Sequence, residues 1–464
     1  MKKQLPFRVL FHAICALSLF ATNAAAGTTC RLQTTRKPGD VDRVVVVLEV
    51  GGNTTSQFDG KEQQAKMSVV CNLAYHEKTL DLPARPGDGK LRSVRYYDKA
   101  EAAIKVGKDT LTPTLRPQRR LIAIELQSQE QETALFSPNG PLSRAELALL
   151  DIQGNTLLLD RLLPEKAVAV GDEWTHSKDL VAALFGPDTV AQCDVKSALT
   201  EVTDQVARME ITGRLKGTYL GAATQMAFKG RYRFDRRSGR IDWFALLVKE
   251  NRDGNEVTEG LDVVARVQVR VGRQATREEL APEALKGLAI EATPQSRLLQ
   301  YEPSDRAWQC AYDRRWIITR ESTDKAVLQM VDRGDMLARC KISPLHKAAK
   351  NDAVELNRFQ EDVREALGES FGQFDSAGVQ MNSANYRVYR VVVSGQARAT
   401  VSGKETTVPI QWRYYLVAER TGRRVVFAFS LEEALADRFG NEDLKLVNSL
   451  RFAEESIAAK ETGG

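Results

Sequence analysis

Apolar and polar residues alternate along much of this chain, and a period of two predicts strands. The clearest example lies near the C-terminus, where the alternation over 410–417 resumes over 425–429 after a polar turn at 420–423. Gly422 suits the positive φ that a tight turn between antiparallel strands requires. The pattern therefore predicts a β-hairpin in this region.

A helix is predicted directly after this hairpin. Ser430 is followed three residues later by Glu433, which is the spacing of a capping box, and apolar residues then recur every four positions as far as Gly440. Together with the large side chain of Trp412 on the first hairpin strand, Ser430 and Glu433 form the structural signature that we expect here.

The first half of the chain shows the same period of two. A short helix is expected after Ser143, with Glu146 completing a second capping box. The predicted strands cover 43–50, 67–75, 102–106, 120–126 and 134–136, followed by a meander over 197–202, 206–215, 225–234, 241–250 and 263–271.

The segment 162–186 allows two interpretations. In the structural one, the chain turns at Gly171 and Trp174 packs its ring on a sheet while its N–H finds an acceptor. In the functional one, Asp172, Glu173 and His176 form an acid/base cluster. Consecutive strand residues point to opposite faces, so we favour the packing corner.

Proline and charge concentrate at 273–304, and we expect a linker there between two domains, 27–272 and 305–453. Beyond it, strands are predicted over 308–318, 326–342, 379–393 and 397–401, with an amphipathic helix over 351–367. The last residues, 454–464, are predicted to be a disordered tail.

The N-terminus predicts export. Three cations precede an apolar run that is too short to span a membrane, and Ala24 to Ala26 supply small residues for cleavage, so residues 1–26 are expected to be a signal peptide. We expect a periplasmic or extracellular protein. The net charge of the whole sequence, +5, includes the cations of the leader. The lysines and arginines of the remaining chain are not clustered, so we expect no nucleic-acid partner.

Five cysteines follow the leader. In an oxidising compartment disulfides are favoured, and the flanking pairs fall in neighbouring predicted strands, so we predict the bridges Cys30–Cys71 and Cys310–Cys340, with Cys193 left over. The three remaining histidines have no metal-ligand spacing, so neither a metal site nor a cofactor is expected.

The C-terminal part of the chain resembles a known family. The phrases WRYYLVAERTGRRVVFAFS and DLKLVNSLRF, with Asp443-x-x-x-Val447-x-x-Ser449, look like the superfamily of photosystem II PsbP and the Ran release factors. The resemblance covers about 304–452. It implies an α/β/α sandwich with an antiparallel sheet and an accessory or binding role, with no catalytic residue.

The phrase VAVGDEWTHS and the meander resemble envelope domains of the LolA-like kind. That resemblance implies a curved antiparallel sheet around a short helix, whose concave face could hold a lipid-like ligand. The fold class expected for the whole chain is thus α+β.

Three function classes remain. We expect a non-catalytic envelope protein that binds another protein or an envelope surface. The alternatives are a carrier of an apolar ligand in the first domain and an unrecognised hydrolase. The hydrolase lacks support, since no nucleophile elbow or phosphate loop occurs and the segment 76–80 fails H-E-x-x-H at Leu80.

Overall fold

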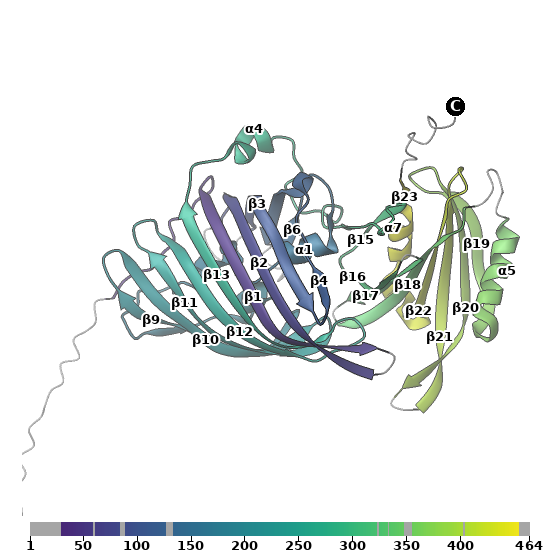
Figure 1. The fold of residues 1–464 in the computed structure, drawn as a ribbon, viewed down its shortest axis with the longest axis horizontal. Helices are drawn as coiled ribbons and strands as arrows, with labels where there is room; N and C mark the ends of the chain where they lie inside the picture. The colour runs from purple at the N-terminus through teal and green to yellow at the C-terminus, as the bar shows by residue number, and fades with distance from the viewer. Residues whose placement is uncertain are drawn as a thin grey trace, which may run out of the picture.

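The computed structural model describes residues 29–58, 61–83, 89–126, 133–322, 324–332, 334–347, 355–401 and 404–453 (Figure 1). The predicted signal peptide and C-terminal tail lie outside these residues. Most of the described residues form large antiparallel sheets, with few and short helices. The protein is thus mostly β, with large antiparallel sheets and a few short helices, which is compatible with the predicted α+β class.

The first half forms a twelve-stranded sheet in the order β6-β5-β3-β2-β1-β13-β12-β11-β10-β9-β8, with β4 beside β3. The predicted meander is confirmed as β9 to β13. The strands are β1 (Val41–Phe58), β2 (Lys61–Asp81), β3 (Leu91–Val106), β4 (Asp109–Leu111), β5 (Leu121–Leu126), β6 (Thr133–Phe136), β8 (Glu173–Thr175), β9 (Thr189–Val202), β10 (Val206–Tyr219), β11 (Ala222–Asp235), β12 (Arg240–Arg252) and β13 (Gly260–Arg273).

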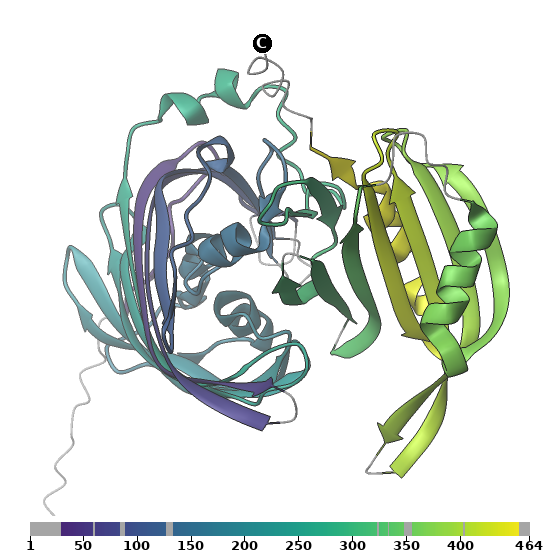
Figure 2. The same ribbon diagram turned by 45° about the vertical axis from the view of Figure 1, so that its right-hand side comes forward.

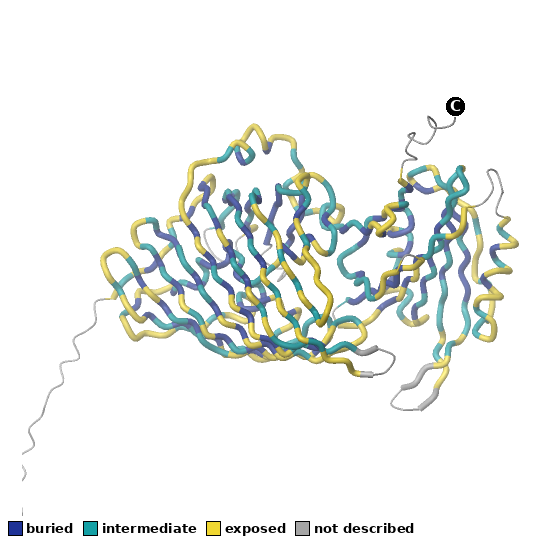
Figure 3. The backbone as a smooth tube through the Cα atoms, viewed as in Figure 1, coloured by how far each residue is buried: buried dark blue, intermediate teal, exposed yellow. Residues whose placement is uncertain are grey.

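This sheet curves around three helices, so it has an inner face that carries them and an outer face turned away (Figure 2). Buried and exposed residues alternate along its strands (Figure 3). The helices are α1 (Arg144–Leu150), α2 (Thr156–Leu159) and α3 (Lys178–Phe185), with η1 (Pro117–Arg119) and η2 (Asp160–Leu162). Their leucines fill the inner side of the curve together with the buried strand residues.

The capping box predicted for the first helix is confirmed. The Ser143 Oγ accepts a hydrogen bond from the Glu146 N–H at 3.1 Å, and the Ser143 N–H donates to the Glu146 carboxylate at 2.8 Å. The Arg116 guanidinium also donates to that carboxylate, at 2.6 Å. The box therefore both starts α1 and fixes it to the segment before β5.

A four-stranded sheet, β23-β15-β14-β7, connects the two halves. It consists of β7 (Leu142–Ser143), β14 (Leu299–Tyr301), β15 (Trp308–Tyr312) and β23 (Arg451–Phe452). The segment expected to be a linker contributes β14 to it, as well as η3 (Glu278–Leu280) and α4 (Pro282–Leu285). Leu280 and Leu285 pack against Val41 and Val94, so this segment is partly anchored on the first sheet.

The C-terminal part is a seven-stranded sheet in the order β16-β17-β18-β22-β21-β20-β19. Its strands are β16 (Trp316–Ser322), β17 (Lys325–Asp332), β18 (Asp335–Leu345), β19 (Phe371–Met381), β20 (Arg387–Val401), β21 (Lys404–Ala418) and β22 (Arg424–Glu432). The predicted hairpin is confirmed as β21 and β22, with Gly422 at φ +92°.

Helices lie on both faces of this sheet (Figure 2). On one face α5 (Leu356–Leu367), followed by η4 (Gly368–Ser370), packs Phe359 and Val363 on β20 and against Trp412. On the other face lie η5 (Glu433–Leu435), α6 (Ala436–Phe439) and α7 (Glu442–Asn448). None of the helices in the described ranges has the length and apolar character to cross a membrane.

The helix predicted to begin at Ser430 is wrong at its start. Strand β22 continues through Ser430 to Glu432, because Ser430 pairs with Trp412 of β21 on one side and with Arg339 of β18 on the other. Pairing on both edges outweighs the local capping signal, and Glu433 begins η5 without a side-chain cap. Gly440 ends the shorter helix α6, as expected.

Three predicted strands are each interrupted by a turn. The run 308–318 is divided into β15 and β16, the run 326–342 is the hairpin of β17 and β18, and the run 379–393 contains the turn between β19 and β20. Gly334 at φ +88° and Asn385 at φ +65° occupy the last two of these turns. Each turn falls on polar residues, at 313–315, 332–335 and 382–385, and the prediction gave too little weight to these turn signals.

Candidate functional site

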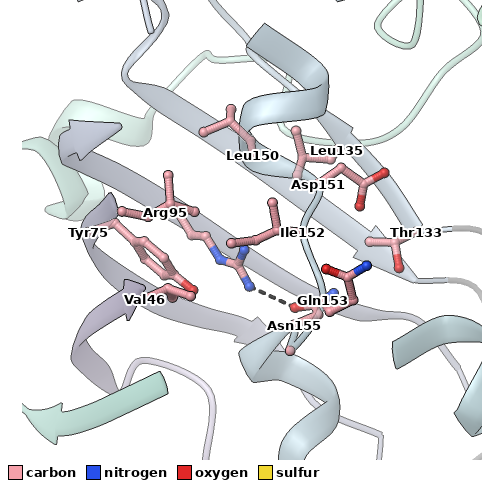
Figure 4. Close-up of a pocket in the computed structure, with 12 residues that line it drawn as sticks. Val46, Tyr75, Arg95, Thr133, Leu135, Leu150, Asp151, Ile152, Gln153 and Asn155 are labelled. Carbon is pink, nitrogen blue, oxygen red and sulfur yellow. Dashed lines mark hydrogen bonds between the residues drawn. The ribbon is translucent and has the colours of Figure 1, made fainter. Parts of the chain in front are cut away.

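A small cavity lies on the inner face of the twelve-stranded sheet, where residues 150–155 cross it (Figure 4). Its volume is about 20 Å³, which is close to the space that one water molecule occupies. It is too small for the acyl chain that a lipid carrier would hold. Its lining is Val46, Leu73, Tyr75, Arg95, Thr133, Leu135, Leu150, Asp151, Ile152, Gln153, Gly154 and Asn155.

Arg95 is the cation of this cavity, and the protein's own acceptors bind it. Its Nε donates to Glu77 Oε1 at 2.7 Å, and its Nη2 donates to Asn155 Oδ1 at 2.7 Å and to Thr156 Oγ1 at 3.0 Å. The guanidinium also lies over the ring of Tyr75, 4.7 Å from its centroid. The Arg95 guanidinium is therefore hydrogen-bonded within the protein and stabilises the fold, which argues against a role in binding an anionic ligand.

A buried ion-pair network continues from Arg95 toward the N-terminal end of the described chain. Arg36 lies 3.1 Å from Asp160, 3.6 Å from Asp42 and 3.7 Å from Glu77. Arg240 in turn lies 3.2 Å from Asp42. The network joins the segment before β1 to β1, β2, β3, η2 and β12, so it ties distant segments together beneath the sheet.

The carboxylates of this network differ in how well they are stabilised. Burial alone raises the pKa of Glu77, but Arg95 and Arg36 outweigh it and hold that pKa below 4.5. Burial raises the pKa of Asp42, and the attraction of Arg36 and Arg240 does not offset it. Glu77 is thus the charged centre of the network, and its surroundings favour stability over proton transfer.

The structure separates the three residues of the possible acid/base cluster. Asp172 accepts a hydrogen bond from the Ala169 N–H at 2.8 Å, and Glu173 pairs with Lys196 at the surface. His176 Nε2 lies 2.7 Å from Ser197 Oγ, a pairing that the sequence analysis did not identify. Among the described residues no carboxylate forms an ion pair with His176, so this histidine and serine lack the acid of a triad.

Trp174 takes the role expected of a packing corner. Its ring is half-buried against the main core, and its Nε1–H donates to the Leu162 carbonyl at 2.8 Å. The buried Tyr232 hydroxyl donates to the same carbonyl at 3.0 Å. The tryptophan therefore closes the end of the sheet over η2.

We expect the His176 environment to make stability depend on pH. Burial lowers the pKa of His176 to about 4, so the folded state keeps the ring neutral while the unfolded state takes up a proton near 6.5. This contribution to stability is complete above pH 6.5 and is lost as pH falls toward 4. Wild type should lose about 2 kcal/mol more than His176→Gln over this interval, as measured by urea unfolding. Equal slopes would contradict the assignment.

The other two described histidines lie in different surroundings. His76 lies 3.3 Å from the Arg43 guanidinium and 3.5 Å from Asp98, and burial together with Arg43 lowers the pKa of His76. His346 is exposed, and its carbonyl accepts a hydrogen bond from Arg424. Within the described ranges no three His, Cys, Asp or Glu side chains are grouped to hold a metal ion.

The predicted bridge between Cys310 and Cys340 is wrong, since both cysteines are free thiols. The two strands expected to pair directly belong to different sheets. Cys310 pairs in register with Tyr301, whereas Cys340 lies between Leu328 and Phe429. Burial raises the pKa of both thiols, which keeps them protonated in the core.

The predicted bridge between Cys30 and Cys71 is also wrong, and Cys193 is free as well. The backbone of Cys30 instead forms an isolated antiparallel β-bridge with that of Val168. Cys71 lies in the middle of β2, with its Sγ 3.9 Å from the Leu149 carbonyl under α1. The two cysteines lie in predicted strands that follow each other in the sequence, but the observed strand pairing does not place them opposite each other.

The outer face of the twelve-stranded sheet has a different character from its interior. Cross-strand pairs place cations beside apolar residues there. Arg270 of β13 lies opposite Val45 of β1 and Trp243 of β12, and Arg266 of β13 lies opposite Leu247 of β12. We call the following residues of β1, β2 and β10 to β13 the outer patch: Val45, Val70, Arg214, Lys229, Trp243, Leu247, Lys249, Val264, Arg266 and Arg270. All are exposed except Trp243, which is half-buried.

Two cations of the outer patch lie opposite an acidic residue of the neighbouring strand, since Arg266 is opposite Glu49 and Arg214 is opposite Asp194, and the other three are not. Among the described residues, all five of them, namely Arg214, Lys229, Lys249, Arg266 and Arg270, make no ion pair. Other arginines of the same face do, since Arg208 pairs with Glu201, Arg231 with Glu210, and Arg233 with Asp242. The sequence carried one signal of this patch, which is cations at alternate positions of neighbouring predicted strands.

Comparisons with known proteins give no family. No family model and no curated protein matches the chain. Distant likenesses exist among solved structures. The Ran-binding protein Mog1p of Saccharomyces cerevisiae matches 33% of this chain and 95% of its own, with 11% identity and a TM-score of 0.26. The structure of MucB of Pseudomonas aeruginosa in complex with MucA matches 90% of this chain and 94% of its own, with 11% identity and a TM-score of 0.15.

A Bacteroides thetaiotaomicron protein matches 34% of this chain with 9% identity and a TM-score of 0.23, and the match spans 48% of that protein. All three TM-scores are below 0.5, so these likenesses carry no argument about function. The functional conclusion therefore depends on the surfaces and sites described above.

Proposed function

We propose that the protein is an exported, non-catalytic binding protein of the cell envelope that docks on an acidic partner through its outer patch. The observation that carries this proposal is a group of five exposed cations on one sheet face, beside exposed apolar side chains, that make no ion pair with any described residue. Only two acidic residues, Glu49 and Asp194, lie directly opposite members of this group. Such a surface attracts an acidic partner at long range and leaves apolar area to bury on contact.

The interior favours binding over catalysis. Glu77 and Arg95 of the inner face are hydrogen-bonded to each other and to neighbouring side chains, and the cavity beside them has room for about one water molecule.

The test is sedimentation of the purified protein with washed envelope membranes from its own source, which contain both lipids and proteins. The double variant Arg266→Glu/Arg270→Glu should bind at least about tenfold more weakly than wild type at low salt, because it reverses two central charges of the patch. The matched control is Lys341→Glu/Arg358→Glu, which makes the same charge change at two exposed cations near the other sheet.

The control variant should bind as wild type does. Failure of the wild-type protein to bind these membranes, or equal binding by both double variants, would contradict the proposal.

A further inference from the structure

We propose that the acidic partner is the headgroup layer of an anionic lipid bilayer, so that the outer patch is a peripheral membrane-contact face; this inference rests on the proposed function. An exposed face with cations beside apolar side chains can attach to the surface of an anionic bilayer without a membrane-spanning segment.

The extent of the outer patch suits a lipid surface. Its residues lie on six neighbouring strands from β2 to β10, a width of about 24 Å at about 4.8 Å per strand. Along β13 they run from Val264 to Arg270, a length of about 20 Å at about 3.4 Å per residue. The five cations of the outer patch, which make no ion pair with any described residue, are thus spread over an area that covers several headgroups at once.

The backbone of this part of the sheet cannot form β-sheet hydrogen bonds with a polypeptide partner. Strands β1, β13, β12, β11 and β10 each pair with a neighbour on both sides, so their N–H and C=O groups are used within the sheet. Addition of a partner strand is therefore impossible at the patch. Contact must be made through side chains alone.

The shape of the face also favours lipid over protein. Stable protein partners anchor large side chains in pockets and require close shape complementarity. Here the sheet bulges outward, and the cavity of Figure 4 opens on the opposite, inner face. A fluid headgroup layer conforms to a bulging surface without a preformed complement.

The order of side-chain lengths fits the same partner. Val45, Val70 and Val264 are exposed by 38, 45 and 47%, yet they are much shorter than the arginines and lysines around them. The cations reach anionic phosphates first, and their aliphatic stems lie with the valines nearer the sheet. Attachment should therefore be mainly electrostatic, with shallow apolar burial.

The experiment uses the purified full protein and protein-free vesicles of equal parts phosphatidylglycerol and phosphatidylcholine. Wild type should sediment with these vesicles, fail to do so with pure phosphatidylcholine, and be released as salt screens the charges. Each cation removed should weaken binding about fivefold, so Arg266→Gln/Arg270→Gln should bind about 25-fold more weakly and the Glu double variant more weakly still.

The Gln variant keeps the length and polarity of the side chains, so a loss of binding with an unchanged circular dichroism spectrum excludes misfolding. Equal binding of wild type and both double variants to the anionic vesicles would overturn the inference. Binding to envelope membranes without binding to the vesicles would also overturn it, and would point to an acidic protein while the proposed function stands. Absence of binding to both would refute the proposed function itself.

Discussion

Replacing Glu77 by alanine should lower the free energy of unfolding by about 3 to 5 kcal/mol. The carboxylate is 1% exposed, and it accepts from Arg95 at 2.7 Å, from Thr156 at 2.6 Å and from Ser93 at 3.0 Å. Its loss would leave the guanidinium groups of Arg95 and Arg36 buried without their shared counter-ion. Urea unfolding followed by circular dichroism at neutral pH measures the change.

The control for this prediction is Glu201→Ala, which removes a surface partner from Arg208. Both side chains of that pair are about half exposed, so the change should be below about 1 kcal/mol. Glu77→Gln keeps the volume but not the charge and should fall between the two. A change below about 1 kcal/mol for Glu77→Ala would mean that the network does not hold these segments together.

Replacing Trp316 by alanine should destabilise the protein by a similar amount, about 3 to 5 kcal/mol. Its ring is 1% exposed and packs edge-on against Phe429 at 5.9 Å and Phe439 at 6.0 Å between ring centroids. These contacts join β16, β22 and α6, so the truncation opens a cavity where the sheet meets its helix. The measurement is again the urea midpoint together with its slope.

Trp412→Ala provides the comparison within the same sheet. Trp412 is only half-buried, against Phe359 and Val363 of α5, and its truncation should destabilise the protein by about 1 to 2 kcal/mol. A larger loss for Trp412 than for Trp316 would contradict the burial that the structure assigns to the two rings.

Prediction from the sequence succeeded where local pattern and tertiary environment agree. The meander β9 to β13 has one face in the core and one in solvent, so its residues alternate and the strands are readable. The capping box of Ser143 and Glu146 is made entirely within four residues, and the structure contains it unchanged.

Prediction failed where distant segments compete with local signals. The same capping spacing at Ser430 and Glu433 did not start a helix, because β18 and β21 pair with the backbone of Ser430 from both sides. The turns after β17 and β19 fall on polar segments, Asp-Arg-Gly-Asp at 332–335 and Asn-Ser-Ala-Asn at 382–385, and the sequence analysis passed over these turn signals.

The two predicted disulfides failed for a related reason. Cys310 and Cys340 belong to different sheets and are free thiols, although they lie near enough for Cys310 to contribute to the raised pKa of Cys340. Cys71 is buried in the middle of β2, whereas Cys30 lies beside Val168.

The sequence by itself determined the strand-rich class, the main strands and the first capping box, because hydrophobic periodicity and capping act over a few residues. Only the tertiary structure decided which charges meet. Glu77, Arg95 and Arg36 are brought together in the interior by strand pairing and a returning segment. Arg214, Lys229, Lys249, Arg266 and Arg270 are more than fifty residues apart at the extremes, yet sheet register places them on one face.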